Sequence, residues 1–245
     1  MAGEEVRERL RALGFAERDV ATLADHFLDA EARGRRGHGL ARVDWLETLP
    51  DLDPTARPAR VVAEPGFERW EGRGALGYLT LAAIVESQLG RPPERARVVV
   101  ASHCFPTGVL GYWVRRLALG GLAAVLTATS PPRLAHPEGG PPLAGTNPVA
   151  IAVPSSDGRP LVADVSMGMA THGDVLAGLA SERDLVPFGG KQAHKPFALA
   201  VALQALVAAL AGPGYGALLV VAPPEDDPVP ALRARGSGVR LPGDR

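Results

Sequence analysis

Apolar residues recur at helical spacing along the first fifty residues of the chain. Val6, Leu10 and Leu13 mark one amphipathic helix, and a second run continues from Val20 to Leu28. Gly14 separates the two runs and suits a helix C-cap. A stretch with three glycines at 34–39 then breaks the pattern, and a short helix resumes until a proline at position 50 stops it. The pattern predicts a helical N-terminal part.

Strand-like and helix-like runs alternate over the rest of the chain. We expect helices at 78–89, 111–119, 169–180 and 197–210, and strands at 97–101, 122–127, 149–154, 161–165 and 217–222. The Pro-rich segment 51–69 is expected to be extended, and 130–148, 186–196 and the tail from 223 to be irregular. This alternation favours an α/β fold. We divide the chain into a helical part (1–70), an α/β core carrying the site (71–222) and a tail (223–245) that returns to the N-terminal part.

Composition and charge narrow the possible partners. The 245 residues carry 26 basic and 27 acidic side chains, so the formal net charge of -1 gives no electrostatic reason to expect nucleic acid or an anionic membrane. A single cysteine, Cys104, excludes an internal disulfide and a multi-cysteine zinc site. The charged N-terminus does not resemble a signal peptide, and the apolar stretch 197–211 is too short for a membrane span. We expect a cytoplasmic protein without a metal.

The first candidate site is Arg36-Gly37-His38-Gly39-Leu40-Ala41-Arg42. His38 and Arg42 lie four residues apart at a helix start and can share one face. An imidazole can donate a proton to a carbonyl or imine, and a guanidinium can bind a carboxylate bidentately. A solvated basic helix start is the alternative interpretation. The sequence contains no G-x-G-x-x-G fingerprint after a strand and no P-loop.

Three further candidates follow strands or precede them. His103 lies at the end of a predicted strand, where ligands of α/β proteins usually bind. The loop Gly145-Thr146-Asn147 exposes backbone N–H groups and short polar side chains that can hold a phosphate or carboxylate. Asp164 ends another strand and is followed by Gly168, so its carboxylate could orient a histidine or bind a cofactor hydroxyl. A surface histidine, a plain turn and a helix N-cap are the respective alternatives.

In their order along the chain, these pieces resemble the malate/L-lactate dehydrogenase family, which is unrelated to the Rossmann-fold dehydrogenases. The resemblance covers the chain from end to end, and its most specific piece is the Gly-Thr-Asn-Pro loop at 145–148. The other matching positions are His38, Gly39, Leu40, Arg42, Gly108, Gly111, Tyr112, Asp164, Gly173, Pro187, Gly189, Gly190, Lys195 and the ending Leu241-Pro242-Gly243-Asp244-Arg245.

The resemblance implies an α/β fold with a helical N-terminal part, a non-Rossmann site for NADPH or NADH, and a homodimer. The implied reaction is reduction of a 2-keto acid or a cyclic imino acid, that is, of a small carboxylate substrate. In it His38 is the general acid, Arg42 holds the substrate carboxylate, and Asp164 supports His38 or the cofactor. The implied cofactor-binding residues are His103, Gly145, Thr146, Asn147 and Gly168.

Several positions depart from the family pattern. Gly37 replaces a serine, Pro106 stands where a histidine is usual, and Met167-Gly168 replaces Thr-Ser. Lys195 is followed by proline, and the segment between residues 173 and 187 is shortened. A second hypothesis therefore stays open: a family member without redox chemistry, acting as an acid/base enzyme on a related substrate or as a silent partner protein. Cofactor binding discriminates between the two hypotheses.

Overall fold

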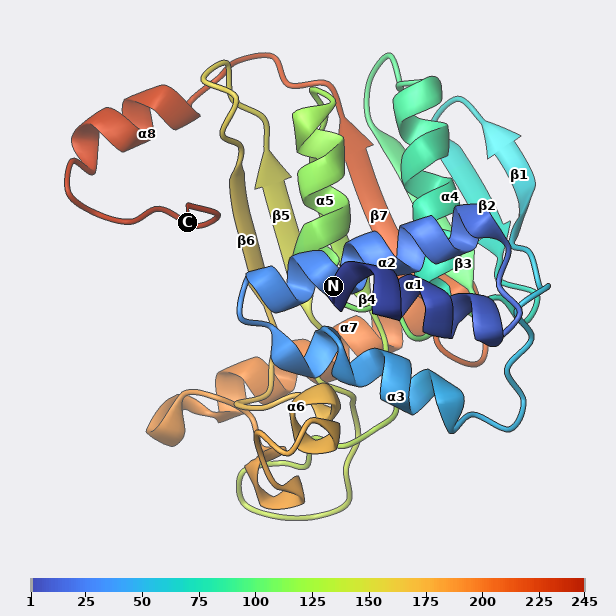
Figure 1. Cartoon of the computed structure of the whole chain (residues 1–245). Helices are drawn as coiled ribbons and strands as arrows, with labels where there is room; N and C mark the ends of the chain where they lie inside the picture. The colour runs from blue at the N-terminus through green and yellow to red at the C-terminus, as the bar shows by residue number, and fades with distance from the viewer. Residues whose placement is uncertain (1, 245) are drawn as a thin grey trace.

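A seven-stranded sheet forms the centre of the protein, which a computed structural model describes over residues 2–244 (Figure 1). The spatial strand order is β1-β2-β3-β7-β4-β5-β6, and only the β2–β3 pair is parallel. The strands are β1 (Ala59–Glu64), β2 (Phe67–Glu71), β3 (Arg97–Ser102), β4 (Ala123–Ala128), β5 (Val149–Val153), β6 (Leu161–Val165) and β7 (Ala217–Ala222).

Helices surround this sheet. They are α1 (Ala2–Ala12), α2 (Glu17–Ala32), α3 (Ala41–Glu47), α4 (Gly77–Gly90), α5 (Leu110–Leu119), α6 (His172–Leu176), α7 (His194–Ala211) and α8 (Val229–Arg235). The α/β class is confirmed, as are the two N-terminal helices and the strands expected between residues 97 and 222.

The main core lies between the sheet and the layer of α4, α5 and α2. Alternate side chains of each strand point to opposite faces, so Val99 and Leu126 face this core. Val100 points the other way and packs against Val207 of α7. The face that carries α7 is less completely covered, since Val125 is 42% exposed.

The Pro-rich segment 51–69, expected to be extended, carries β1 and the start of β2, which form a hairpin with its turn at Pro65-Gly66. Other local details differ from the expectations. The helix expected at 169–180 covers only His172–Leu176, which Thr171 and Asp174 begin with a capping box. The tail contains the short helix α8. The apolar stretch 197–211, expected to be too short for a membrane span, is part of the longer helix α7, which begins at His194. The 18 residues of α7 are long and apolar enough to cross a membrane by length and composition, and 22% of them are buried.

The C-terminal segment folds back against the β5–β6 hairpin. Arg233 of α8 pairs with Asp157 of the hairpin turn at 2.6 Å, and the Val162 amide donates to the Pro242 carbonyl at 3.1 Å. β1 and β2 come from the first seventy residues but join the common sheet. The division of the chain at residues 70 and 222 stays a prediction.

Candidate active site

His38 lies in the connection between α2 and α3, and Arg42 lies in the first turn of α3. A 3-10 turn, η1 (Arg36–His38), precedes α3, and Arg42 is buried with an exposed fraction of 7%. Its Nε donates a 2.9 Å hydrogen bond to the Gly37 carbonyl oxygen. Because the terminal guanidinium nitrogens form no hydrogen bond within residues 2–244, they can bind an anion.

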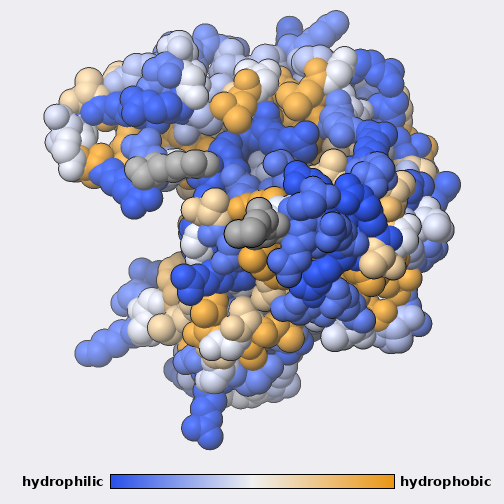
Figure 2. Space-filling model, viewed as in Figure 1, coloured by the Kyte–Doolittle hydropathy of each residue, from blue (hydrophilic) through white to orange (hydrophobic). Residues whose placement is uncertain are grey.

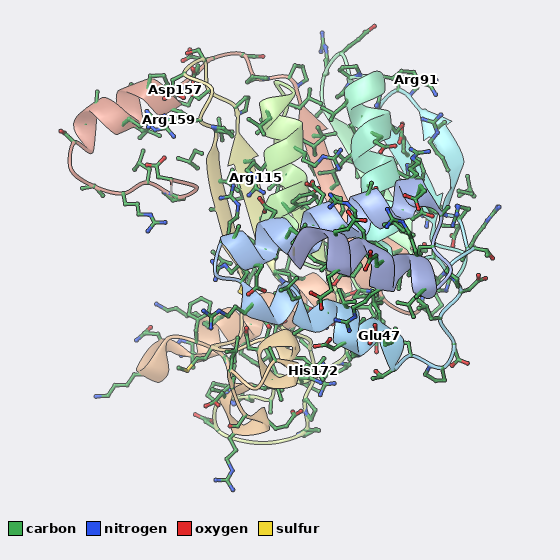
Figure 3. All side chains as sticks on the ribbon, in the orientation of Figure 1. Glu47, Arg91, Arg115, Asp157, Arg159 and His172 are labelled. Atoms are coloured by element: carbon green, nitrogen blue, oxygen red, sulfur yellow. The ribbon has the colours of Figure 1, made fainter. Side chains whose placement is uncertain are left out.

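Both side chains line a pocket of about 220 Å³. Its other walls are the loop before α5, the loop after β4, and the segment that runs from Asp164 to Asp174. Thr146 and Tyr78 also line it. Figure 3 shows His172, another lining residue, at the start of α6 beneath α3. Segments far apart in the sequence therefore meet at this pocket.

Two buried polar atoms at the pocket lack a protein partner. Nδ1 of His38 and the hydroxyl of Tyr78 form no hydrogen bond with any residue in the described chain. A buried polar atom without a partner costs about 1–3 kcal/mol, and such atoms commonly mark a place that a ligand or ordered water fills. The pocket thus offers hydrogen-bonding groups to a bound polar molecule.

The charges of the pocket favour an anion. Arg35, Arg42 and Arg133 line it, against the carboxylates of Asp164 and Asp174, and Asp174 accepts the capping bonds of α6. Burial, aided by the Arg42 and Arg35 charges, lowers the pKa of His38 to about 3. Burial and the Arg133 and Arg42 charges also lower the pKa of His172. Both imidazoles are therefore neutral at pH 7 in the free pocket.

Asp164 lies at the pocket wall and contacts α5. Its Oδ2 accepts a 2.7 Å hydrogen bond from the Gly111 amide in the first turn of that helix. Burial raises the pKa of the carboxyl, while the Gly111 bond and the Arg35 charge oppose this shift. Since Nδ1 of His38 has no partner among the described residues, Asp164 does not orient His38 through that atom. Its role toward a cofactor stays a prediction.

The structure therefore brings together four of the predicted site residues, His38, Arg42, Thr146 and Asp164. It does not bring Gly145, Asn147, Gly168 and His103 to the pocket wall.

The other predicted loop residues have structural surroundings instead. Asn147 is fully buried, donates to the Ala200 carbonyl and Gln204, and accepts from the Ser130 amide, so its side chain fastens the loop to α7. A Cβ atom at position 145 would collide with Ser130, which explains that glycine by close packing.

The remaining two predicted residues also face elsewhere. The amide of Gly168 bonds to the Ser166 hydroxyl at 3.2 Å. His103 points to solvent with 62% of its side chain exposed and pairs with Glu71 at 3.2 Å. The chain turns after His103, at a φ of 51°, and the residues that follow, 105–110, form the pocket wall instead.

Sequence reasoning missed Tyr78, His172 and the polar wall formed by Thr107 and Thr129. Tyr78 lies in an apolar helix and carries no local signal, because its neighbours only predict burial. His172 follows Asp164 by eight residues, in a segment expected to be plain helix. A polar, titratable residue at the first position of that helix was the available signal.

Comparison with known proteins gives a consistent result. A model of the malate/L-lactate dehydrogenase family matches residues 2–184. The chain is 34% identical over 178 residues to a (2R)-3-sulfolactate dehydrogenase (NADP(+)) of Chromohalobacter salexigens, covering 68% of this chain and 51% of that relative. It is 28% identical to a Δ1-pyrroline-2-carboxylate/Δ1-piperideine-2-carboxylate reductase of Pseudomonas putida, covering 85% and 70% respectively. The match thus spans about half the length of the first relative.

Solved structures share the architecture. Malate dehydrogenase from Entamoeba histolytica superposes with a TM-score of 0.84 at 18% identity, covering 99% of this chain and 85% of that one. Δ1-piperideine-2-carboxylate reductase from Pseudomonas syringae pv. tomato gives 0.83 at 23% identity, covering 99% and 89%. These likenesses confirm the fold that the resemblance implied.

Proposed function

Because the chain belongs to the malate/L-lactate dehydrogenase family, we propose that it is an NAD(P)H-dependent reductase of a small 2-keto acid or cyclic imino acid. This proposal depends mainly on the pocket that His38 and Arg42 share. In it the imidazole Nδ1 and the terminal guanidinium nitrogens form no hydrogen bond with any described residue, so they can bind a ligand. The relatives named above, a sulfolactate dehydrogenase and an imino-acid reductase, act on small carboxylates by their names.

Arg42 would bind the substrate carboxylate through its terminal nitrogens, since Nε is occupied by the Gly37 carbonyl. His172, which lines the same pocket, would hold the same group or a neighbouring polar substituent. The buried hydroxyl of Tyr78 offers a further hydrogen bond. These contacts would fix the carbonyl or imine carbon relative to His38.

His38 would move the proton of the reaction. The nicotinamide, when bound, supplies or accepts the hydride. In the reductive direction His38 donates its proton to the carbonyl oxygen or imine nitrogen, which becomes a hydroxyl or an amine. Burial is the main cause of the lowered pKa of His38, and the Arg42 and Arg35 charges add to it. A substrate carboxylate beside Arg42 would offset only this charge-based part and so shift the equilibrium toward the protonated imidazole. In the oxidative direction the neutral imidazole is ready to accept that proton.

The fit of a nicotinamide cofactor is supported by Thr146, Asp164 and Ser166, which line the same pocket as His38 and Arg42. Their hydroxyl and carboxylate oxygens can accept hydrogen bonds from ribose hydroxyls and the carboxamide. We propose Thr146 and Asp164 as the cofactor-facing residues of this site.

The test is binding of NADPH and of NADH, followed by the fluorescence of the reduced nicotinamide, and then reduction of a panel of 2-keto acids and cyclic imino acids. We expect micromolar binding of at least one cofactor and a measurable turnover. His38→Ala should lower turnover about 10²- to 10⁴-fold while cofactor binding persists. His194→Ala, at an exposed position outside the pocket, serves as the matched control.

Failure of both cofactors to bind up to millimolar concentration would overturn the proposal. The remaining hypothesis would then be a non-redox acid/base enzyme, which the intact pocket of His38 and Arg42 supports better than a silent partner protein.

A further inference from the structure

A second cavity, of about 380 Å³, adjoins the candidate active site. Arg35, Val109 and Asp164 line both cavities, so the two are neighbours across a shared wall. The second cavity lies between the end of α2, the start of α5, β6 and the C-terminal segment. Figure 2 shows an opening between that segment and the body of the molecule, bordered by both hydrophilic and hydrophobic residues. We call this cavity the arginine groove, after the four arginines that line it: Arg33, Arg35, Arg115 and Arg240.

The arginine groove carries uncompensated positive charge. The Arg35 side chain forms no hydrogen bond or ion pair with any residue between 2 and 244, and the Arg240 side chain donates only to the Asp244 backbone carbonyl, at 3.1 and 2.9 Å. Arg33 and Arg115 share a single carboxylate, that of Asp29. Four guanidinium groups in one concave site are a strong attraction for phosphate, whose oxygens match the planar guanidinium fork.

The two carboxylates of the groove are already engaged. Asp164 accepts the Gly111 amide at 2.7 Å. Asp244 accepts from Arg233 at 3.2 Å and from the Leu241 amide at 3.1 Å. A free carboxylate can accept a hydrogen bond from a ribose 2′-hydroxyl but repels a 2′-phosphate, whereas a guanidinium attracts the phosphate. Because the carboxylates of the arginine groove are engaged and its positive charge is uncompensated, the groove favours a ribose with a 2′-phosphate.

The groove is also held in place from outside. Arg233 ties α8 to Asp157, and the Val162 amide binds the Pro242 carbonyl at 3.1 Å, so Arg240 projects from an anchored segment. Figure 3 shows Asp157 beside α8, and Arg115 on α5 at the side that faces this segment. Because the surrounding backbone is fixed, Arg240 is presented to a ligand with a smaller entropic cost than a free tail would incur.

We propose that the arginine groove binds the phosphorylated adenosine half of the dinucleotide and selects the cofactor with a 2′-phosphate, NADP(H), over NAD(H). This inference rests on the proposed function, because the nicotinamide end must occupy the adjoining pocket. Arg35 is shared with that pocket and would meet the pyrophosphate. Arg240 lines only the groove and would hold the 2′-phosphate.

The test measures fragment binding by calorimetry, independently of catalysis. Adenosine 2′,5′-bisphosphate and adenosine 5′-monophosphate are titrated into the full chain and its variants. We expect the bisphosphate to bind about 10- to 100-fold more tightly than the monophosphate. Arg240→Gln should remove most of this preference while leaving monophosphate affinity within about 3-fold. Arg35→Gln should weaken both fragments.

Controls separate this inference from the function it rests on. Arg95→Gln, an exposed arginine far from the groove, should leave both affinities unchanged, and thermal unfolding checks that each variant folds. Equal affinity for the two fragments, or an unchanged preference in Arg240→Gln, would overturn the inference. If NADH and NADPH then bind equally well, the proposed reductase stands without it. If neither dinucleotide binds, the proposed function and this inference fail together.

Discussion

Two buried imidazoles lie close to the candidate active site, and only one of them lines it. His26 of α2 is fully buried, and its Nε2 accepts the Val109 amide at 3.1 Å, just before α5. Its ring packs against Tyr78 with 4.9 Å between ring centroids. Burial, and next the neighbouring His38, lower the pKa of His26 to about 3. His26 thus positions the loop beside the pocket in its neutral form.

This burial makes stability depend on pH. The folded-state pKa of His26 lies below its unfolded value near 6.5, so its contribution is complete above pH 6.5 and is lost as the pH falls toward 3. Between pH 7 and pH 5 we expect His26 to remove about 2 kcal/mol from the free energy of unfolding. Urea unfolding at both pH values measures this loss, which His26→Gln should reduce by that amount. The same loss in both proteins would contradict the assignment.

The residues that line the pocket were predictable from the sequence where they belong to a short motif. The spacing of His38 and Arg42 placed both in one pocket, and Asp164 and Thr146 reached the same pocket from strand ends. The sequence could not show that the Asn147 side chain bonds to Ala200, because a Gly-Thr-Asn-Pro loop has the same composition whether its amide faces a ligand or the protein. Tyr78 could not be found, since its hydroxyl is distinguished only by tertiary surroundings.

Among the structural elements, η1 and α6 make a close backbone contact at the site. A Cβ atom at residue 37 would lie 2.5 Å from the amide nitrogen of Asp174 and 2.6 Å from the carbonyl carbon of Gly173. Only a glycine at 37 allows this approach. The close contact sets the distance between His38 on one element and His172 on the other. In this chain the serine-to-glycine departure at position 37 therefore has a packing reason.

Substituting this glycine should separate the two elements. Gly37→Ala is expected to cost about 1–3 kcal/mol of folding stability through overpacking and to weaken carboxylate binding in the pocket. Chemical denaturation gives the first quantity and calorimetric titration of a 2-keto acid the second. Gly90→Ala, where a Cβ would meet nothing within 4 Å, is the matched control. Wild-type stability and binding in Gly37→Ala would show that the contact is not required.

Elements with regular periodicity were predictable, and those shaped by proline were not. The strand run 97–101 and the helix run 111–119 correspond closely to β3 and α5. Segment 51–69 was expected to be extended, but its pairing into the β1–β2 hairpin was not predicted, although Pro65-Gly66 forms the turn. In α8 prolines occupy the N-cap and the first turn, where a missing amide costs nothing. A proline at such a position is compatible with the beginning of a helix, but a proline-rich composition alone does not show where that helix begins.

At the scale of the whole molecule, the sheet face that carries α7 exposes apolar side chains. Val220, Val125 and Ile151 are opposite one another on three adjacent strands and form a partly exposed row. Leu199 and Leu206 of α7 are 46% and 45% exposed. The accessible surface of 12047 Å² exceeds by roughly 1,700 Å² what is typical of a monomer of this mass. A standard interface buries about 800 Å² per partner, so the excess is sufficient for a second copy of this chain.

We therefore propose that the homodimer expected from the sequence uses this face. Wild-type protein should sediment at twice its mass of 25.5 kDa at micromolar concentration, and Ile151→Lys should shift it to the monomer. Leu119→Lys, at an exposed leucine on α5, should leave the dimer intact. A wild-type monomer, or an Ile151→Lys dimer, would contradict the proposal.

The place of β7 in the sheet has a consequence for synthesis of the chain. β7 is the last strand in chain order, yet it lies between β3 and β4 and pairs with both. Until a ribosome has released residues 217–222, the nascent sheet consists of two halves, each with an unpaired edge. Such edges are templates for aggregation, and pairing so distant in sequence is slow. The growing polypeptide must therefore be protected, by chaperones or by rapid completion, until its final strand joins the halves.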